Sequence, residues 1–106
     1  MIITDQNTLG VLLTGTTHYL RVSSEAEFAI FYETAETARM ALPDGNRRSG
    51  VWRLTPTGYH VDWTGGPSAN WQIDVEPGHI VYRDGDGVER GTVTRIVPGD
   101  AAALAA

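Results

Sequence analysis

Apolar and polar residues alternate along the second half of the chain, which is the period of a β-strand with one buried face. The alternating segments lie near 50–55, 59–64, 69–75, 79–83 and 88–97. Turn-forming residues occupy the gaps between them: Thr57-Gly58, Gly65-Gly66-Pro67-Ser68, Pro77-Gly78 and Asp84-Gly85-Asp86-Gly87. The pattern predicts five consecutive antiparallel strands joined by hairpins.

The turns also predict which side chains share a face, because a slip of one residue turns a strand's side chains to the other side. A two-residue loop at Thr57-Gly58 sets Trp52 opposite Trp63. A loop centred on Pro67 sets Trp63 opposite Trp71. Both registers predict that the three tryptophans lie on the same side of the sheet.

The third turn, Pro77-Gly78, sets Ile73 opposite Tyr82 and agrees with the other two. Together the turns predict one buried face that carries these residues: Trp52, Leu54, Tyr59, Val61, Trp63, Trp71, Ile73, Val75, Ile80 and Tyr82. The opposite face collects polar side chains: Arg53, His60, Asp62, Gln72, Asp74, His79 and Arg83. We therefore expect a sheet with one aromatic side and one wet side.

The first half of the chain begins with a predicted helix from about 5 to 14, in which apolar residues recur at helical spacing and Gly15 supplies the stop. A strand follows over 16–22, with His18 on the same side as Leu20 and Val22.

Residues 24–42 are compatible with two structures. As a helix, the segment has a capping box at Ser24 and Glu27 and ends before Pro43. This alternative gives an α+β fold, with helix 24–42 packed on a five-stranded antiparallel sheet. As strands, the segment begins with alternating side chains up to Tyr32 and has a turn at 34–36. Local propensity by itself favours the helix.

Composition limits the fold to one small domain, because 106 residues leave no room for a second core. We expect a single domain over 1–98, which the resemblance described below implies to be β-barrel-like, and a flexible Ala-rich tail over 99–106. No apolar run reaches the length of a membrane span, and residues 1–5 lack the features of a signal peptide. We therefore expect a cytoplasmic protein with no membrane partner.

The absence of two residue types excludes several chemistries. The chain has no Cys and no Lys, so it has no thiolate nucleophile, no disulfide and no side-chain Schiff base. The net charge of -5 and the scattered arginines disfavour a nucleic-acid partner. The three histidines are predicted to face different ways, so we expect no metal site and no cofactor.

Four stretches carry a resemblance to a known group of proteins: NTLGVLLTGTTHYL, FYETAETARM, GVWRLTPTGYHVDW and ANWQIDV. Together they resemble small bacterial proteins of unknown function from proteobacteria. In that group a short helix precedes an aromatic strand pair around a Gly turn, and a Gly-x-Trp strand leads into a hairpin rich in Trp and Cys. The match covers most of the chain.

The resemblance implies strands in the segment that local propensity leaves open. It aligns Phe31-Tyr32 and Ala38-Arg39 with a strand, a turn and a strand. The implied fold is mainly β, an eight-stranded antiparallel up-and-down meander or small barrel of the calycin kind, with the N-terminal helix closing one end. Many members of the group look exported and carry a Cys pair that this chain lacks, which fits a cytoplasmic relative.

The aromatic face is the main candidate for a ligand site, since flat apolar rings with a polar handle suit small apolar or aromatic molecules. The alternative is that the rings fill a core, because an eight-stranded barrel has little free interior. The predicted ligand contacts are Tyr32, Trp52, Tyr59, Trp63, Trp71 and Tyr82. His18 is the imidazole predicted to point inward, as a general acid or base or as a hydrogen-bonded core residue.

Three hypotheses for function follow. The first is the binding of one small apolar or aromatic molecule in the barrel. The second is a cofactor-free lyase or isomerase that uses His18 in the same cavity. The third is a protein interaction module or homodimer that pairs through a sheet edge or the aromatic face.

Overall fold

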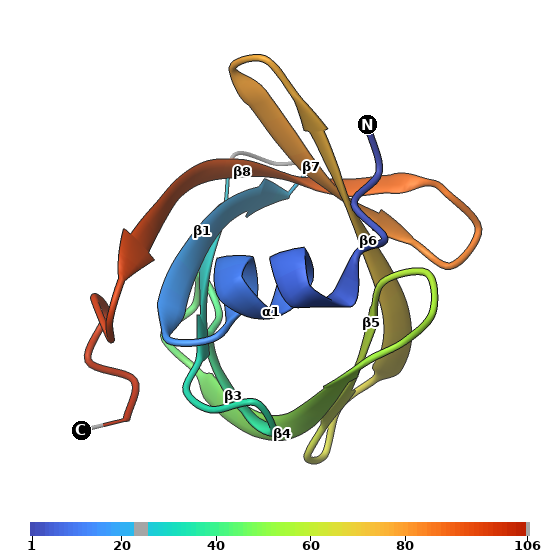
Figure 1. The fold of residues 1–106 in the computed structure, drawn as a ribbon. Coiled ribbons are helices and arrows are strands. Elements are labelled where there is room, and N and C mark those ends of the chain that lie inside the picture. The colour runs from blue at the N-terminus through green and yellow to red at the C-terminus, as the bar shows by residue number, and fades with distance from the viewer. Residues whose placement is uncertain (23–25, 106) are drawn as a thin grey trace.

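The computed structural model describes residues 1–22 and 26–105 as a short helix followed by eight strands. The elements are α1 (Gln6–Leu13), β1 (Thr16–Val22), β2 (Ala26–Tyr32), β3 (Thr37–Ala41), β4 (Arg47–Leu54), β5 (Tyr59–Trp63), β6 (Ser68–Glu76), β7 (His79–Asp84) and β8 (Glu89–Pro98). Every strand pairs antiparallel with its neighbours in the chain, and β8 also pairs with β1 (Figure 1). The predicted mainly β fold, a meander closed into a barrel, is confirmed.

The helix α1 closes one end of the barrel and lies across its opening in Figure 1. Asp5 caps its N-terminus, where the carboxylate accepts a hydrogen bond of 2.9 Å from the backbone N–H of Thr8. Leu9 and Leu13 are fully buried and point into the barrel. Gly15 then takes a φ of 76°, a conformation that favours glycine, and the chain turns into β1.

The alternative of a helix over 24–42 is wrong, because the segment forms the β2–β3 hairpin. Its capping residue Ser24 lies outside the described residues. Pairing of β2 with both β1 and β3 outweighs the local helix propensity. The turn is stabilised by Thr34, whose hydroxyl oxygen accepts hydrogen bonds from the backbone N–H groups of Glu36 and Thr37 at 3.1 and 3.0 Å.

Two of the three predicted registers are wrong. Trp52 lies opposite Val61 rather than Trp63, a shift of two residues. The cause is the turn, which closes between Thr55 and Gly58 through a hydrogen bond of 2.9 Å and so has its two loop residues one position earlier than predicted.

The β5–β6 register differs by four residues, and Trp71 lies opposite Tyr59 rather than Trp63. Its turn is centred on Gly65, which has a φ of 70°, rather than on Pro67. The β6–β7 register, with Ile73 opposite Tyr82, is confirmed. Since both shifts are even, each side chain keeps its predicted face.

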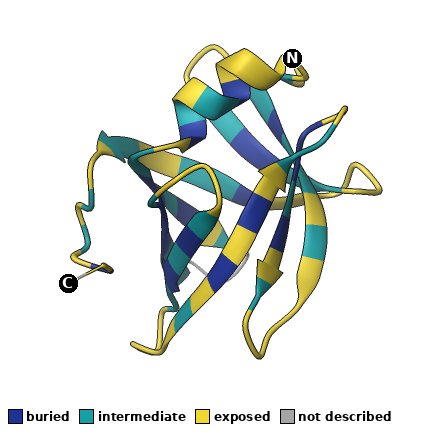
Figure 2. Cartoon of the chain, turned by 60° about the horizontal axis from the view of Figure 1, so that its bottom comes forward, coloured by how far each residue is buried: buried dark blue, intermediate teal, exposed yellow. Residues whose placement is uncertain are grey.

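Burial alternates along the strands, as the dark and light bands of Figure 2 show. Arg53 and Asp62 are exposed on the outer wall. The inner wall supplies a hydrophobic core made of these buried residues: Leu9, Leu13, Leu20, Ile30, Tyr32, Ala38, Met40, Trp52, Tyr59, Val61, Ile73 and Tyr82. The large rings of the second half of the chain thus converge inside the barrel.

The segment after β8 packs on the outer wall at one point. Leu104 is buried against Ala29 and Phe31 of β2. The side chain of Asp100 accepts a hydrogen bond of 2.7 Å from the backbone N–H of Leu104, which holds the segment in a turn. The flexibility expected for residues 99–106 stays a prediction.

Candidate functional site

Four aromatic rings meet at the centre of the barrel. Tyr32 lies edge-on to Trp52 and Tyr59, with ring centroids 5.2 and 5.9 Å apart. Tyr59 in turn lies edge-on to Tyr82 at 6.1 Å. Such edge-to-face pairs add to the stability gained from burial. The rings come from β2, β4, β5 and β7, so the cluster ties opposite walls of the barrel together.

The hydroxyl groups of the three tyrosines form one hydrogen-bonded chain that ends on His18. The Tyr32 oxygen lies 3.2 Å from the Tyr59 oxygen and 2.9 Å from the Tyr82 oxygen. The Tyr82 oxygen lies 2.9 Å from Nδ1 of His18. Each of these hydroxyl groups therefore has a hydrogen-bond partner, as buried polar groups require.

The neighbours of His18 determine which group donates and which accepts in each of these hydrogen bonds. Nε2 lies 3.1 Å from the carbonyl oxygen of Leu12 and 3.1 Å from Oγ1 of Thr16. The Thr16 hydroxyl has a single proton, and it donates that proton to the carbonyl of Leu12 or Leu13. Nε2 must therefore carry a proton, and Nδ1 accepts the one from Tyr82. It follows that Tyr32 donates to Tyr82, and Tyr59 to Tyr32.

Burial keeps all four groups neutral at pH 7. Desolvation lowers the pKa of His18 from 6.5 to about 4, against a smaller opposing effect of the Leu12 carbonyl. Desolvation also raises the pKa of Tyr32 to about 12, and it raises the pKa values of Tyr59 and Tyr82 well above 10.0. The hydrogen-bonded series thus joins one weakly basic imidazole to three weakly acidic hydroxyl groups.

A cavity of about 200 Å³ lies beside the tyrosines, and its lining holds no residue of α1. It opens toward the end of the barrel opposite α1, which we call the mouth, where the β3–β4 and β5–β6 loops lie. The lining is formed by Leu20, Val22, Phe28, Ile30, Tyr32, Met40, Leu42, Arg48, Tyr59, Val61, Trp63, Pro67, Trp71 and Tyr82. Apolar side chains predominate, which suits an apolar guest.

The predicted ligand contacts divide into two groups. Tyr32, Tyr59, Trp63, Trp71 and Tyr82 line the cavity. Trp63 and Trp71 are half-buried, whereas the three tyrosines are buried, and Trp63 is the last residue of β5, next to the β5–β6 loop at the mouth.

Trp52 and His18 lie outside the cavity lining. The Trp52 indole is held on the far side of the tyrosines, where its N–H donates a hydrogen bond of 2.8 Å to the carbonyl of Thr34. His18 is fully buried, is hydrogen-bonded to Tyr82 and lies edge-on to the Tyr32 ring at 5.2 Å, and both tyrosines line the cavity. Its predicted inward orientation is seen, and its neighbours are those of a hydrogen-bonded core residue.

Sequence reasoning missed the polar side chain at the mouth, Arg48. The predicted strand began at Gly50, whereas β4 begins at Arg47. The alternation of inward residues, Arg48, Gly50 and Trp52, was present in the sequence and would have placed Arg48 on the inner face.

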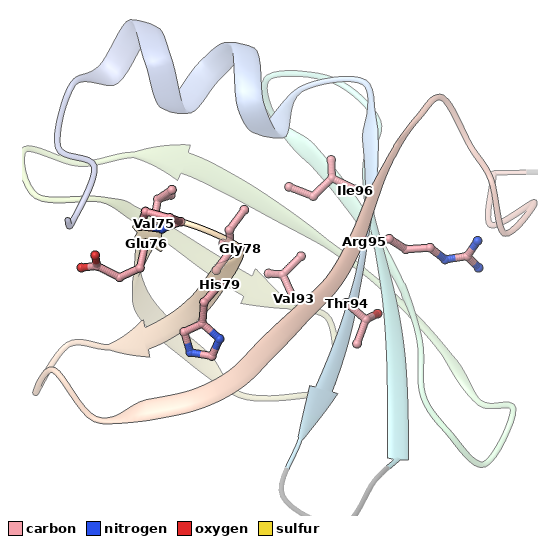
Figure 3. A pocket seen from close by; sticks show the side chains of 10 residues that line it. Val75, Glu76, Gly78, His79, Val93, Thr94, Arg95 and Ile96 are labelled. Atoms are coloured by element: carbon pink, nitrogen blue, oxygen red, sulfur yellow. The ribbon is translucent and has the colours of Figure 1, made fainter.

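A second hollow lies between the β6–β7 hairpin and β8, where the lining residues Val75, Ile80 and Val93 pack against the core (Figure 3). It measures about 610 Å³ and is lined by Val75–Ile80 and Val93–Ile96. Strand β8 continues past its last pair with β7, Ile80 with Val93, which leaves the wall hollowed there. Arg95 points away from the hollow and lies over the Tyr19 ring at 4.0 Å (Figure 3). The His79 side chain, which also lines the hollow, is exposed.

The described part of the chain holds no cluster of three or more His, Asp or Glu side chains that could bind a metal ion. His60 lies on the outer wall, with its ring nitrogens 2.8 Å from Asn70 and 2.9 Å from Asp62. No helix among the described residues has the length and hydropathy needed to cross a membrane.

These features define the chain as an eight-stranded antiparallel up-and-down β-barrel with a buried aromatic cluster and one apolar cavity at its mouth. No family model matches the chain, and no match was found among curated proteins or solved structures. The barrel fold that the resemblance implied is confirmed. Membership of the group of small proteobacterial proteins and a relation to calycin barrels stay predictions.

Proposed function

We propose that this barrel binds one small, mostly apolar or aromatic molecule in the cavity beside Tyr32, Tyr59 and Tyr82. The observation that carries the proposal is the unfilled space of about 200 Å³ among apolar side chains, in a barrel of a size that side chains alone can fill. A dry cavity of about 150 Å³ holds benzene in another protein. The space here therefore suits a single substituted aromatic ring.

The expected affinity follows from the surface that such a guest would bury. An aromatic ring buries roughly 150 to 250 Å², which at about 25 cal/mol per Å² gives about 4 to 6 kcal/mol before the cost of association. The walls regain van der Waals contacts that they lack next to an empty space. Taken as a binding free energy, about 4 to 6 kcal/mol corresponds to a dissociation constant between about 1 mM and about 40 μM, and the cost of association places the expected value at the weaker end of that range.

Proton-transfer catalysis by His18 has less support than binding. With a pKa near 4, the His18 imidazole is a weak base, and it contacts Tyr32 and Tyr82 of the cavity lining without being part of that lining. The raised pKa of Tyr82 makes that hydroxyl a weak acid in turn. A guest would therefore meet a neutral hydroxyl rather than an activated base.

Association through a sheet edge also has less support. Each of the eight described strands has two neighbours, and closure of a barrel removes the long open edge that strand addition needs. A homodimer stays a prediction, to be checked by sedimentation at several protein concentrations.

Replacing Val61 with phenylalanine is expected to abolish binding of 4-bromobenzyl alcohol, a neutral probe of about the right size. Val61 is buried and lines the cavity, so the added ring would occupy the space of the guest. Isothermal titration calorimetry of the wild type and V61F measures the effect, with at least a tenfold weakening expected.

The matched control is Val51→Phe. Val51 lies on the neighbouring strand, opposite Asp62, and its side chain is 57% exposed on the outer wall. The probe should bind V51F as it binds the wild type. Equal affinities for wild type, V51F and V61F would place the probe outside the barrel and refute the proposal.

A further inference from the structure

Arg48 is the charged residue of the cavity lining. It stands on β4 directly opposite Met40 of β3, and both residues belong to the inner face at the mouth. The Arg48 side chain is half-buried, whereas its neighbours Arg47 and Ser49 are exposed. A guanidinium group therefore borders a space that is otherwise lined by apolar and aromatic side chains.

The β5–β6 turn leaves room for this guanidinium. A Cβ atom added to Gly66 would lie 2.8 Å from Nη1 of Arg48 and 3.2 Å from Cβ of Trp63. A larger residue at position 66 would therefore displace the arginine. The absence of a side chain there lets Arg48 lie across the mouth next to the Trp63 side chain.

Several arginines of this acidic chain have a carboxylate partner, and Arg48 differs from them. Arg39 pairs with Glu33 at 2.9 Å. Arg83 pairs with Asp74 at 2.9 Å, and Arg90 with Asp84 at 2.7 Å. Among the described residues, Arg48 forms no ion pair with a carboxylate. A half-buried charge without a partner in apolar surroundings favours the approach of an anion.

We propose that the preferred guest is an aromatic carboxylate, with its ring in the cavity and its carboxylate on Arg48 at the mouth. The inference rests on the proposed binding function and names the class of ligand for the same site. A planar guanidinium can bind both oxygens of a carboxylate at once. The tyrosine hydroxyls at the inner end are already bonded to one another, so the ring end of the guest should be apolar.

The test compares two probes of nearly the same shape, 4-bromobenzoate and 4-bromobenzyl alcohol, by calorimetry at pH 7 and low salt. The wild type should bind the carboxylate at least about tenfold more tightly, because a hydrogen bond to a charged group is stronger than one to a neutral group. Arg48→Met keeps the length of the side chain and removes the charge. It should abolish the preference and leave the affinity for the alcohol nearly unchanged.

Arg53→Met is the matched control, since Arg53 is exposed on the outer wall of the same strand. It should retain the wild-type preference. Arg48→Lys keeps the charge but loses the planar fork, and it should show an intermediate preference. Circular dichroism verifies that each variant is folded.

The outcomes separate the two proposals. If the wild type binds both probes equally, or if folded R48M keeps the preference, the carboxylate inference is overturned and the binding function stands. If neither probe binds the wild type, both proposals are overturned. The comparison of the two probes on the wild type decides the question even if R48M does not fold.

Discussion

Trp52→Ala is expected to lower the free energy of unfolding by about 3 to 5 kcal/mol, the usual range for a buried Trp replaced by alanine. The Trp52 indole is 3% exposed and packs edge-on against Tyr32 and Tyr59. Its removal leaves a space at the centre of the barrel and removes the hydrogen bond to the Thr34 carbonyl. Urea unfolding followed by far-ultraviolet circular dichroism measures the change.

The control is Trp63→Ala, which removes the same side chain at the mouth, where it is half-buried. A smaller loss of stability is expected there, together with weaker binding of the probes. Trp52→Phe retains a ring and gives a measurable variant if Trp52→Ala does not fold. Equal losses at positions 52 and 63, or a loss below about 1 kcal/mol at Trp52, would contradict the account of the core.

Lowering the pH from 7 to 4 is expected to reduce the free energy of unfolding by about 3 kcal/mol through the protonation of His18. The pKa of this imidazole is about 4 in the folded chain and near 6.5 in the unfolded one. The unfolded state therefore binds more protons within that window, and the free energy of unfolding falls as the pH falls. The shift, at 1.36 kcal/mol per pKa unit, gives the stated figure.

The measurement is the free energy of unfolding from urea titrations at several pH values. In His18→Gln the decrease between pH 6.5 and pH 4 should be smaller by about that amount, since the titrating group is absent. His79→Gln is the control, because His79 is exposed and should leave the wild-type profile unchanged. If the free energy of unfolding of H18Q fell with pH as that of the wild type does, protonation of His18 would not destabilise the fold, and the expectation would be contradicted.

Alternation along the strands predicted the faces of the sheet but not its registers. Trp52 and Val61 both point inward as predicted, although Trp52 was paired with Trp63. Faces depend on the parity of residue positions, which survives any even shift. Registers depend on where a turn closes, and several neighbouring turn residues, such as those at 55–58, can occupy the loop positions.

The strand structure of residues 26–41 could not be derived from local preference, which favoured a helix. A strand in a barrel is stabilised by pairing with the strands on either side, which the propensity of its own residues does not include, and β2 pairs with β1 and β3. Helix propensity amounts to less than about 1 kcal/mol per ordinary residue, and tertiary pairing exceeds it.

The candidate site was predicted in its aromatic part and not in its polar part. Tyr59 and Tyr82 could be placed together because each lies on an inward position of a strand that the alternation predicts, and Tyr32 joins them through the strand that the resemblance implies. The chain of their hydroxyls to His18 depends on distances across the barrel, which no sequence pattern encodes. Arg48 was missed because the predicted strand began at Gly50, whereas β4 begins at Arg47.

The most direct test of the account is a crystal structure of the protein with bound 4-bromobenzyl alcohol, in which anomalous scattering locates the bromine atom. The account predicts a single bromine inside the barrel, in contact with Trp63, Trp71 or the central tyrosines. A bromine in the second hollow, between the β6–β7 hairpin and β8, or none within the barrel at saturating probe, would contradict it.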